Sequence, residues 1–89
     1  MDTRDTHTAD DIERWVVATC RDLGLRVEDA DVDFFSCGGT SLAAMRLIAS
    51  VEDAFGEGVL PLDAFYDHPV LREIAGLIAE NRLATSQAG

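Results

Sequence analysis

The sequence contains no lysine, only two histidines and two prolines, and no long apolar segment. Its 89 residues carry 17 acidic side chains against seven arginines, for a formal net charge of −10. A surface of this sign repels phosphate backbones and anionic lipids, so nucleic acids and membrane surfaces are poor partners, whereas basic protein patches are attracted. No stretch approaches the ~20 apolar residues that a membrane-spanning helix needs.

Cysteine is scarce as well, because Cys20 and Cys37 are the only two. Two cysteines do not make the disulfide framework of a small secreted domain. The first five residues contain no apolar run, so the sequence does not indicate a signal peptide. We therefore expect a cytoplasmic protein with free thiols, and a monomer.

A chain of this length is expected to form one small domain with a thin core. Its apolar residues recur at helical spacing in three segments. The pattern predicts a first helix that begins within residues 8–11 and is ended by Gly24. It predicts a second helix over residues 40–55, with Thr40 as its cap and Gly56 at its end.

The remaining segments contain one long loop, one short helix and the last helix. The loop over residues 25–40 is unusually long for so small a domain, and Phe34 and Phe35 are expected to anchor it to the core. Pro61 can start a short helical turn. The last helix is expected to begin at residues 68–69 and to fade over residues 82–84. The predicted fold is all-α, with three main helices, one short helix and no sheet.

Motifs for catalysis and for metal binding are incomplete. Ser41 lies in a Gly-x-Ser-x-Ala window that lacks the second glycine of a hydrolase elbow, and the two histidines are not placed to serve it as a base. The alternating acids Asp29, Asp31 and Asp33 lack the glycine and glutamate of a calcium loop, and are expected to form a solvated acidic run. The cysteines show no zinc spacing, and Cys20 fits a small core residue. We predict no catalytic residue and no metal site.

One local motif has a distinct pattern. It reads Asp33-x-Phe35-x-x-Gly38-Gly39-Thr40-Ser41-Leu42 and is followed by an amphipathic helix. This order resembles the thiolation motif of the phosphopantetheine-dependent carrier proteins, in the Gly-Gly-x-Ser form of peptidyl carriers. The resemblance covers residues 10–83 and includes the segment from Pro61 to Pro69 before the last helix. It departs from the family at Cys37, where leucine is usual, and at Val70, where a capping serine or threonine is common, so that this helix start is expected to fray.

The resemblance implies an acyl-carrier-like helical bundle over residues 10–84, between a flexible start (1–9) and a flexible tail (85–89). It implies that a phosphopantetheinyl transferase attaches 4′-phosphopantetheine from coenzyme A to Ser41, with Gly38, Gly39 and Thr40 shaping the turn. The start of a helix suits the resulting phosphodiester anion. The protein would then hold an aminoacyl or peptidyl group as a thioester and deliver it to partner enzymes in nonribosomal peptide biosynthesis. Those partners are an adenylation or acyl-activating enzyme, and condensation, tailoring or thioesterase enzymes.

Partner recognition is expected on the second helix. Its core face is formed by Ala44, Leu47, Ile48, Val51 and Phe55. A second apolar stripe follows Ser41 and is expected to be exposed, beside the single charge of Arg46; its members are Leu42, Met45 and Ala49. We expect a free-standing carrier. Two alternatives stay open: an acyl carrier for a polyketide or fatty-acid-derived starter unit, and a helical interaction module in which Ser41 is only a cap.

Overall fold

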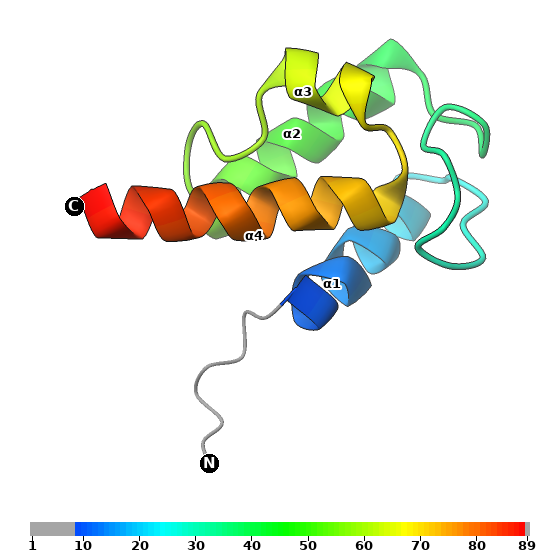
Figure 1. Ribbon diagram of the computed structural model, residues 1–89. Helices are drawn as coiled ribbons and strands as arrows, with labels where there is room; N and C mark the ends of the chain where they lie inside the picture. The colour runs from blue at the N-terminus through cyan, green and yellow to red at the C-terminus, as the bar shows by residue number, and fades with distance from the viewer. Residues whose placement is uncertain (1–8, 89) are drawn as a thin grey trace.

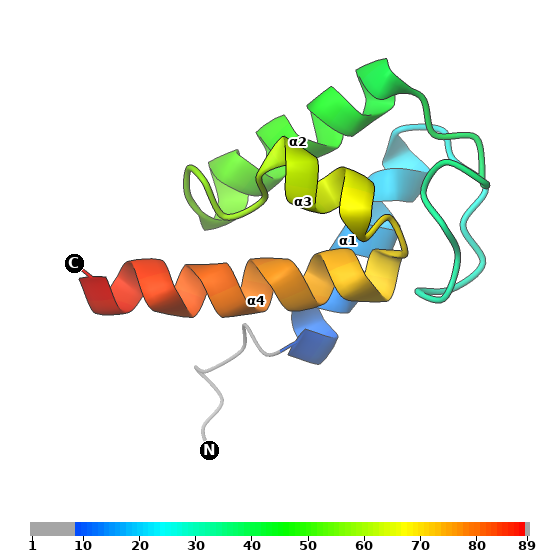
Figure 2. The same cartoon turned by 45° about the horizontal axis from the view of Figure 1, so that its top comes forward.

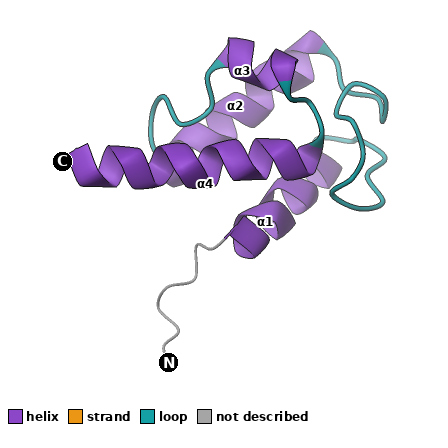
Figure 3. Cartoon of the chain, in the orientation of Figure 1, coloured by secondary structure: helices purple, strands orange, loops and turns teal. Residues whose placement is uncertain are grey.

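The computed structural model describes the backbone of residues 9–88 and the side chains of residues 10–82. Four helices follow one another along the chain: α1 (Ala9–Asp22), α2 (Ser41–Phe55), α3 (Leu62–Asp67) and α4 (Leu71–Ala88). Within residues 9–88 there is no strand, only an isolated bridge between Asp33 and Val70 (Figure 3). The predicted all-α bundle of three main helices and one short helix is therefore confirmed.

The long helix α4 packs mainly against α1, and α2 contacts both of them. The short helix α3 lies near α2 and above α4 in both views (Figures 1 and 2). The loop between α1 and α2 closes the end of the bundle at which α1 ends and α2 and α4 begin. None of the four helices in the described part of the chain combines the length and apolar character that a bilayer crossing requires.

The hydrophobic core draws side chains from every helix and from both long connections. Its larger buried members are Ile12, Val16 and Cys20 of α1, Leu47 and Val51 of α2, Phe65 of α3, Leu71, Ile74 and Ile78 of α4, and Phe34, Val59 and Leu60 of the connections. The predicted core role of Cys20 is confirmed, because its side chain is fully buried. Burial raises the pKa of the Cys20 thiol to about 12, with a smaller contribution from Cys37, so this thiol stays protonated at neutral pH.

Glycines end the first two long helices as the sequence predicts. Gly24 follows α1 with a φ of 95°, and the next residue, Leu25, donates its N–H to the carbonyl of Cys20 at 3.1 Å. Gly56 follows α2 with a φ of 119° and donates to the carbonyl of Glu52. Positive φ is costly for residues that carry a Cβ, so these two positions require glycine and fix where the helices stop.

The last helix differs from its prediction at both ends. It continues to Ala88, so the expected end over residues 82–84 was wrong, and residues 85–88 of the expected tail are helical. No proline or glycine interrupts residues 77–88, and the alanines there favour a helix. Residues 1–8 and 89 of the two expected flexible termini lie outside the described residues. The domain boundaries at residues 10 and 84 stay a prediction.

The start of α4 is capped by the backbone of the long loop. Leu71 donates its N–H to the carbonyl of Val32 at 3.0 Å, and Arg72 donates to the carbonyl of Ala30 at 2.8 Å. Because these carbonyls satisfy N–H groups that a capping side chain would otherwise serve, the fraying expected from Val70 is not found. The helix begins at Leu71, two residues after Pro69, whose carbonyl accepts the N–H of Phe34 at 2.8 Å.

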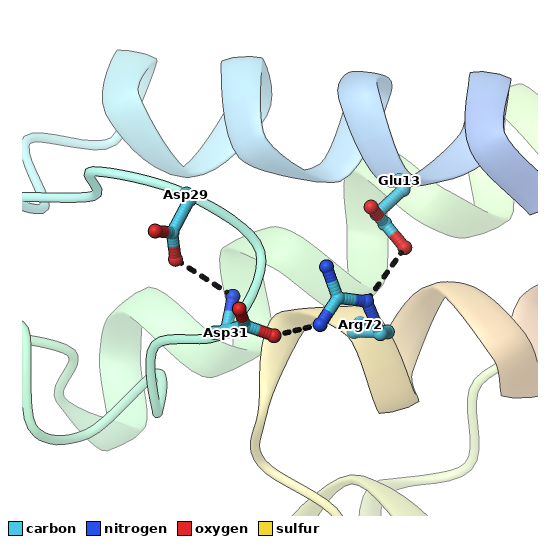
Figure 4. A network of polar contacts seen from close by, with 4 residues as sticks. All are labelled: Glu13, Asp29, Asp31 and Arg72. Atoms are coloured by element: carbon cyan, nitrogen blue, oxygen red, sulfur yellow. Dashed lines mark hydrogen bonds and ion pairs between the residues drawn. The ribbon is translucent and has the colours of Figure 1, made fainter.

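Charged side chains attach the same loop to α1 and α4. The guanidinium of Arg72 contacts Asp31 and lies 3.3 Å from the Glu13 carboxylate of α1 (Figure 4). Arg21 of α1 donates from Nε to the carbonyl of Val27 at 2.9 Å. The acidic run is therefore more than the solvated segment expected from sequence, because Asp31 belongs to this network.

Candidate functional site at the start of helix α2

The turn before α2 depends on two adjacent glycines for different reasons. Gly38 has a φ of 103°, which a residue with a Cβ rarely adopts. Gly39 packs against Phe34, and a Cβ at this position would fall 2.5 Å from the Phe34 carbonyl oxygen and closer still to the ring. The two glycines expected to shape the turn thus act in different ways, Gly38 through its backbone angle and Gly39 through its packing on Phe34.

The residues just before the glycines fold back on themselves. The Asp33 carboxylate accepts the N–H groups of Phe35 at 2.8 Å and Ser36 at 3.1 Å, which closes a tight turn. The half-buried Cys37 donates its S–H to the carbonyl of Phe34 at 3.3 Å, and its own carbonyl accepts the N–H of Arg26. Cys37 therefore occupies an internal position, and burial raises the pKa of its thiol.

An aromatic cluster connects this turn to α3 and to the core. Phe34 is fully buried, and its ring meets those of Phe35 and Phe65 edge to face at centroid distances of 5.2 and 5.0 Å. Phe35 also stacks on Tyr66 of α3, with centroids 5.4 Å apart and an interplanar angle of 8°. The prediction that Phe34 and Phe35 anchor the loop is confirmed, and the anchor includes α3 as well as the core.

Ser41 is the first residue of α2, and its side chain is exposed to solvent. Thr40 caps the helix as predicted, because its hydroxyl accepts the N–H of Ala43 at 3.1 Å. The Ser41 hydroxyl lies 3.5 Å from the phenolic hydroxyl of Tyr66, and either group can be the donor. Sequence reasoning did not single out Tyr66; the available signal was an aromatic pair, Phe65 and Tyr66, in a helix too short to bury both rings.

The start of α2 differs electrostatically from the other helix starts. The first turns of α1, α3 and α4 each contain an acidic residue, whereas the first turn of α2 contains none. The first N–H groups of a helix have no acceptor within the helix, and together they carry a partial positive charge. An exposed hydroxyl at an acid-free helix start therefore fits the attachment of an anionic phosphodiester.

Several large apolar side chains of α2 and α3 are exposed on the surface. The stripe expected on α2 is exposed: Leu42 is 63% and Met45 is 53% accessible, and Ala49 and Arg46 are also exposed. Two side chains of α3, Leu62 and Tyr66, are exposed as well, at 42% and 46% accessibility. We call Leu42, Met45, Leu62 and Tyr66 the α2–α3 patch. Its α2 half was predicted; its α3 half was not. Arg46 borders a shallow pocket of about 180 Å³ with Leu23, Thr40, Leu42 and Ala43.

His68 is the one histidine in the part of the chain that the structure describes, and it is paired away from the serine. Its Nδ1 lies 3.8 Å from the carboxylate of Glu73 at the start of α4. The hydroxyl of Ser41 instead faces a phenol, which is a poor general base. Within residues 10–82, whose side chains the structure describes, the Ser41 hydroxyl is thus accessible and has the Tyr66 phenol, not a histidine, beside it.

Comparison with known proteins gives one family. The sequence profile described as "Phosphopantetheine attachment site" matches residues 15–78, which is more than half of the chain. The chain is 38% identical over 66 residues to phosphinothricin tripeptide synthetase PhsB of Streptomyces viridochromogenes, covering 74% of this chain and 6% of that protein. It is 35% identical over 80 residues to malformin synthetase mlfA of Aspergillus brasiliensis, covering 86% and 2%.

A shorter and closer match is enterobactin synthase component F of Escherichia coli, which is 51% identical over 39 residues, covering 44% of this chain and 3% of that protein. The chain thus spans no more than 6% of the length of these curated relatives. No solved structure matches the chain. With the profile covering most of the helical bundle, the chain belongs to the phosphopantetheine attachment site family, whose carrier domains bind 4′-phosphopantetheine covalently and are not catalytic in themselves.

Proposed function

We propose that Ser41 is the attachment point of 4′-phosphopantetheine and that the protein is a peptidyl-type carrier. The observation that carries this proposal is the exposed Ser41 hydroxyl at the one described helix start that has no acidic residue in its first turn. Thr40 and the two glycines before it hold this hydroxyl at the surface. The membership of the chain in the attachment family supports the same assignment.

Modification requires a separate phosphopantetheinyl transferase with magnesium. The Ser41 oxygen forms a new bond to the phosphorus that bears the pantetheine, and the phosphoanhydride bond of coenzyme A breaks. The nucleotide part leaves with the second phosphate, and the hydroxyl proton passes to a base of the transferase. The contribution of this chain is the start of α2, whose N–H groups and partial positive charge stabilise the phosphodiester anion.

The proposed cargo is an aminoacyl or peptidyl group in nonribosomal peptide biosynthesis. The thiol at the end of the attached arm supplies the thioester linkage to that group. The identities of the relatives support this assignment, because they are a tripeptide synthetase, malformin synthetase and an enterobactin synthase component. The alternative cargo, an acyl starter unit for a polyketide or fatty-acid product, shares the same arm. Loading assays with amino-acid ligases and acyl ligases distinguish the two.

The proposed partners are the transferase, an adenylation or acyl-activating enzyme, and condensation, tailoring or thioesterase enzymes. We propose that they dock on Leu42, Met45, Arg46 and Ala49, which are exposed on the helix that Ser41 begins. Methionine adapts to several partners, and the acidity of the protein raises the encounter rate with basic surfaces. We also propose that the protein is monomeric and cytoplasmic; the free thiols of Cys20 and Cys37 fit a reducing compartment.

Intact mass after incubation with coenzyme A and a permissive transferase tests the attachment site. We expect the wild type to gain one phosphopantetheine, Ser41→Ala to gain none, and Ser36→Ala, which removes another exposed hydroxyl of the same region, to be modified normally. A wild type that stays unmodified, or a Ser41→Ala variant that is modified, rejects the proposal. A wild type that stays unmodified instead favours a helical interaction module in which Ser41 is only a cap.

Met45→Glu tests the docking role of α2. A carboxylate in the middle of an apolar contact should lower the transferase kcat/KM and the loading rate by about tenfold or more. Ala54→Glu is the matched control, because it adds the same charge at an exposed position in the last turn of α2. Equal rates for the two variants would exclude Met45 from the docking surface.

A further inference from the structure

The contact between Ser41 and Tyr66 joins two elements that are far apart in sequence. Ser41 begins α2 and Tyr66 lies in α3, and their hydroxyl oxygens are 3.5 Å apart, at the limit of a hydrogen bond. Both side chains are exposed, so water competes for this bond in the unmodified protein. The contact by itself contributes little to stability. The phenol becomes more important once the serine is modified.

The position of the Tyr66 hydroxyl is set by packing of its ring. The ring stacks on Phe35 at 5.4 Å and approaches Phe65 at 6.1 Å. Phe65 is fully buried and packs on Phe34, which is also fully buried. A chain of aromatic contacts thus connects the Tyr66 ring to the core and places its hydroxyl beside Ser41.

Attachment of a phosphodiester changes the direction and the strength of this hydrogen bond. The serine oxygen loses its proton on modification, so it can only accept, and Tyr66 becomes the donor. The phosphodiester also brings two nonbridging oxygens that share a negative charge, one bond beyond the phosphorus. Hydrogen bonds to an ionised acceptor are shorter and about twice as strong as those between neutral groups. A phenol that already stands 3.5 Å from the ester oxygen is within reach of them.

The charges around the site make a neutral donor useful there. On α3 the residues near Tyr66 are acidic, since Asp63 and Asp67 lie on the same short helix and are exposed. The basic side chain of Arg46 belongs to α2, not to α3, and borders the pocket that Thr40 and Leu23 line. On the α3 side of Ser41, the phenolic hydroxyl of Tyr66 is the group that lies 3.5 Å from the serine oxygen, and it carries no charge of its own to repel an anion.

We propose that Tyr66 is a positioning residue for the prosthetic group: it donates its phenolic hydrogen to the phosphodiester on Ser41 and so directs the base of the arm towards α3. This inference rests on the proposed attachment at Ser41. It assigns to α3 a role in orienting the arm that is separate from docking of partner enzymes.

Tyr66→Phe removes the hydroxyl and keeps the ring that stacks on Phe35. The wild type, Tyr66→Phe and Ser36→Ala are each converted to the modified form, and intact mass verifies complete conversion. The ³¹P NMR spectrum of the modified proteins then reports on the phosphodiester. We expect Tyr66→Phe to shift the ³¹P resonance by more than its linewidth, whereas Ser36→Ala leaves it in place.

A second measurement observes the phenol directly. Tyr66 is the only tyrosine of the chain, so ¹³C labelling at the ring carbon that bears the hydroxyl gives a single tyrosine signal. We expect this signal to move between the unmodified and modified wild type. Failure of the wild type to be modified contradicts attachment at Ser41. Normal modification with an unchanged ³¹P resonance in Tyr66→Phe, or an unchanged ¹³C signal in the wild type, overturns the role of Tyr66 alone.

Discussion

Helices α2 and α4 begin at the same end of the molecule, beside the same loop, but their first N–H groups have different kinds of acceptor. At α4, backbone carbonyls of Val32 and Ala30 accept the N–H groups of Leu71 and Arg72. At α2, a side chain is the cap, because the Thr40 hydroxyl accepts the N–H of Ala43 and leaves Ser41 exposed next to it. The loop therefore covers one helix start and presents the other.

The first turns of α4 and α2 differ in charge as well as in how far the loop covers them. The first turn of α4 contains Glu73, and Arg72 there contacts Asp31 of the loop. The first turn of α2 has no acidic residue, in a chain with a net charge of −10. A covered helix start holds the loop in place, whereas an open and acid-free start remains available for an anion.

Gly39→Ala should have the largest effect on stability, because it disturbs both helix starts together. The added Cβ would collide with the Phe34 ring and carbonyl, and Phe34 in turn donates its N–H to Pro69 just before α4. We expect the free energy of unfolding, measured by urea denaturation, to fall by about 3 kcal/mol.

Gly76→Ala is the matched control for this variant. Gly76 lies within α4 and nothing stands within 4 Å of the Cβ position, so alanine there should be neutral or stabilising by up to about 1 kcal/mol. If Gly39→Ala proved as stable as the wild type, the glycine would not be needed for contact with Phe34.

Thr40→Ala should affect the start of α2 alone. It removes the side-chain acceptor of the Ala43 N–H, and loss of such a cap costs about 1 kcal/mol. Urea unfolding measures the loss, and Thr40→Ser, which keeps a hydroxyl in the same place, should recover most of it. A loss that Thr40→Ser does not recover would mean that the threonine acts through its methyl group.

Arg72→Met should have the smallest effect and should be confined to the loop and the start of α4. The side chain is 54% exposed, so its contacts with Glu13 and Asp31 are screened by solvent, and we expect a loss below about 1 kcal/mol. The loss should shrink further in high salt. Arg14→Met, which affects a more exposed pair with Asp11, serves as the control. A loss of several kcal/mol that salt does not reduce would contradict this assignment.

Much of the site was predictable because its signals are local. The bounds of α2, the Thr40 cap, the left-handed glycines and the exposed stripe at Leu42 and Met45 depend on residues within one or two helical turns. The prediction failed where the partner is distant in sequence. Tyr66 is 25 residues from Ser41, and the carbonyls that cap α4 belong to residues some 40 positions earlier.

The end of α4 was missed for another reason. Residues 79–88 contain no glycine or proline to mark a helix end, and their loss of a regular apolar face was interpreted as the start of a tail although their alanines favour a helix. The start of α4, by contrast, lacks a capping side chain and was therefore expected to fray. Its caps are backbone carbonyls of another segment, which the local sequence does not indicate.

The sequence by itself determined the number and order of the helices, the bounds of α2, the turn before Ser41 and the family, because helix periodicity, glycine angles and side-chain caps act between near neighbours along the chain. Only the tertiary structure decided that Tyr66 faces the serine, that the loop backbone covers the start of α4, and that two residues of α3 extend the exposed patch. Those features arise when Phe34, Phe35 and Phe65 pack together, which brings distant segments within contact distance.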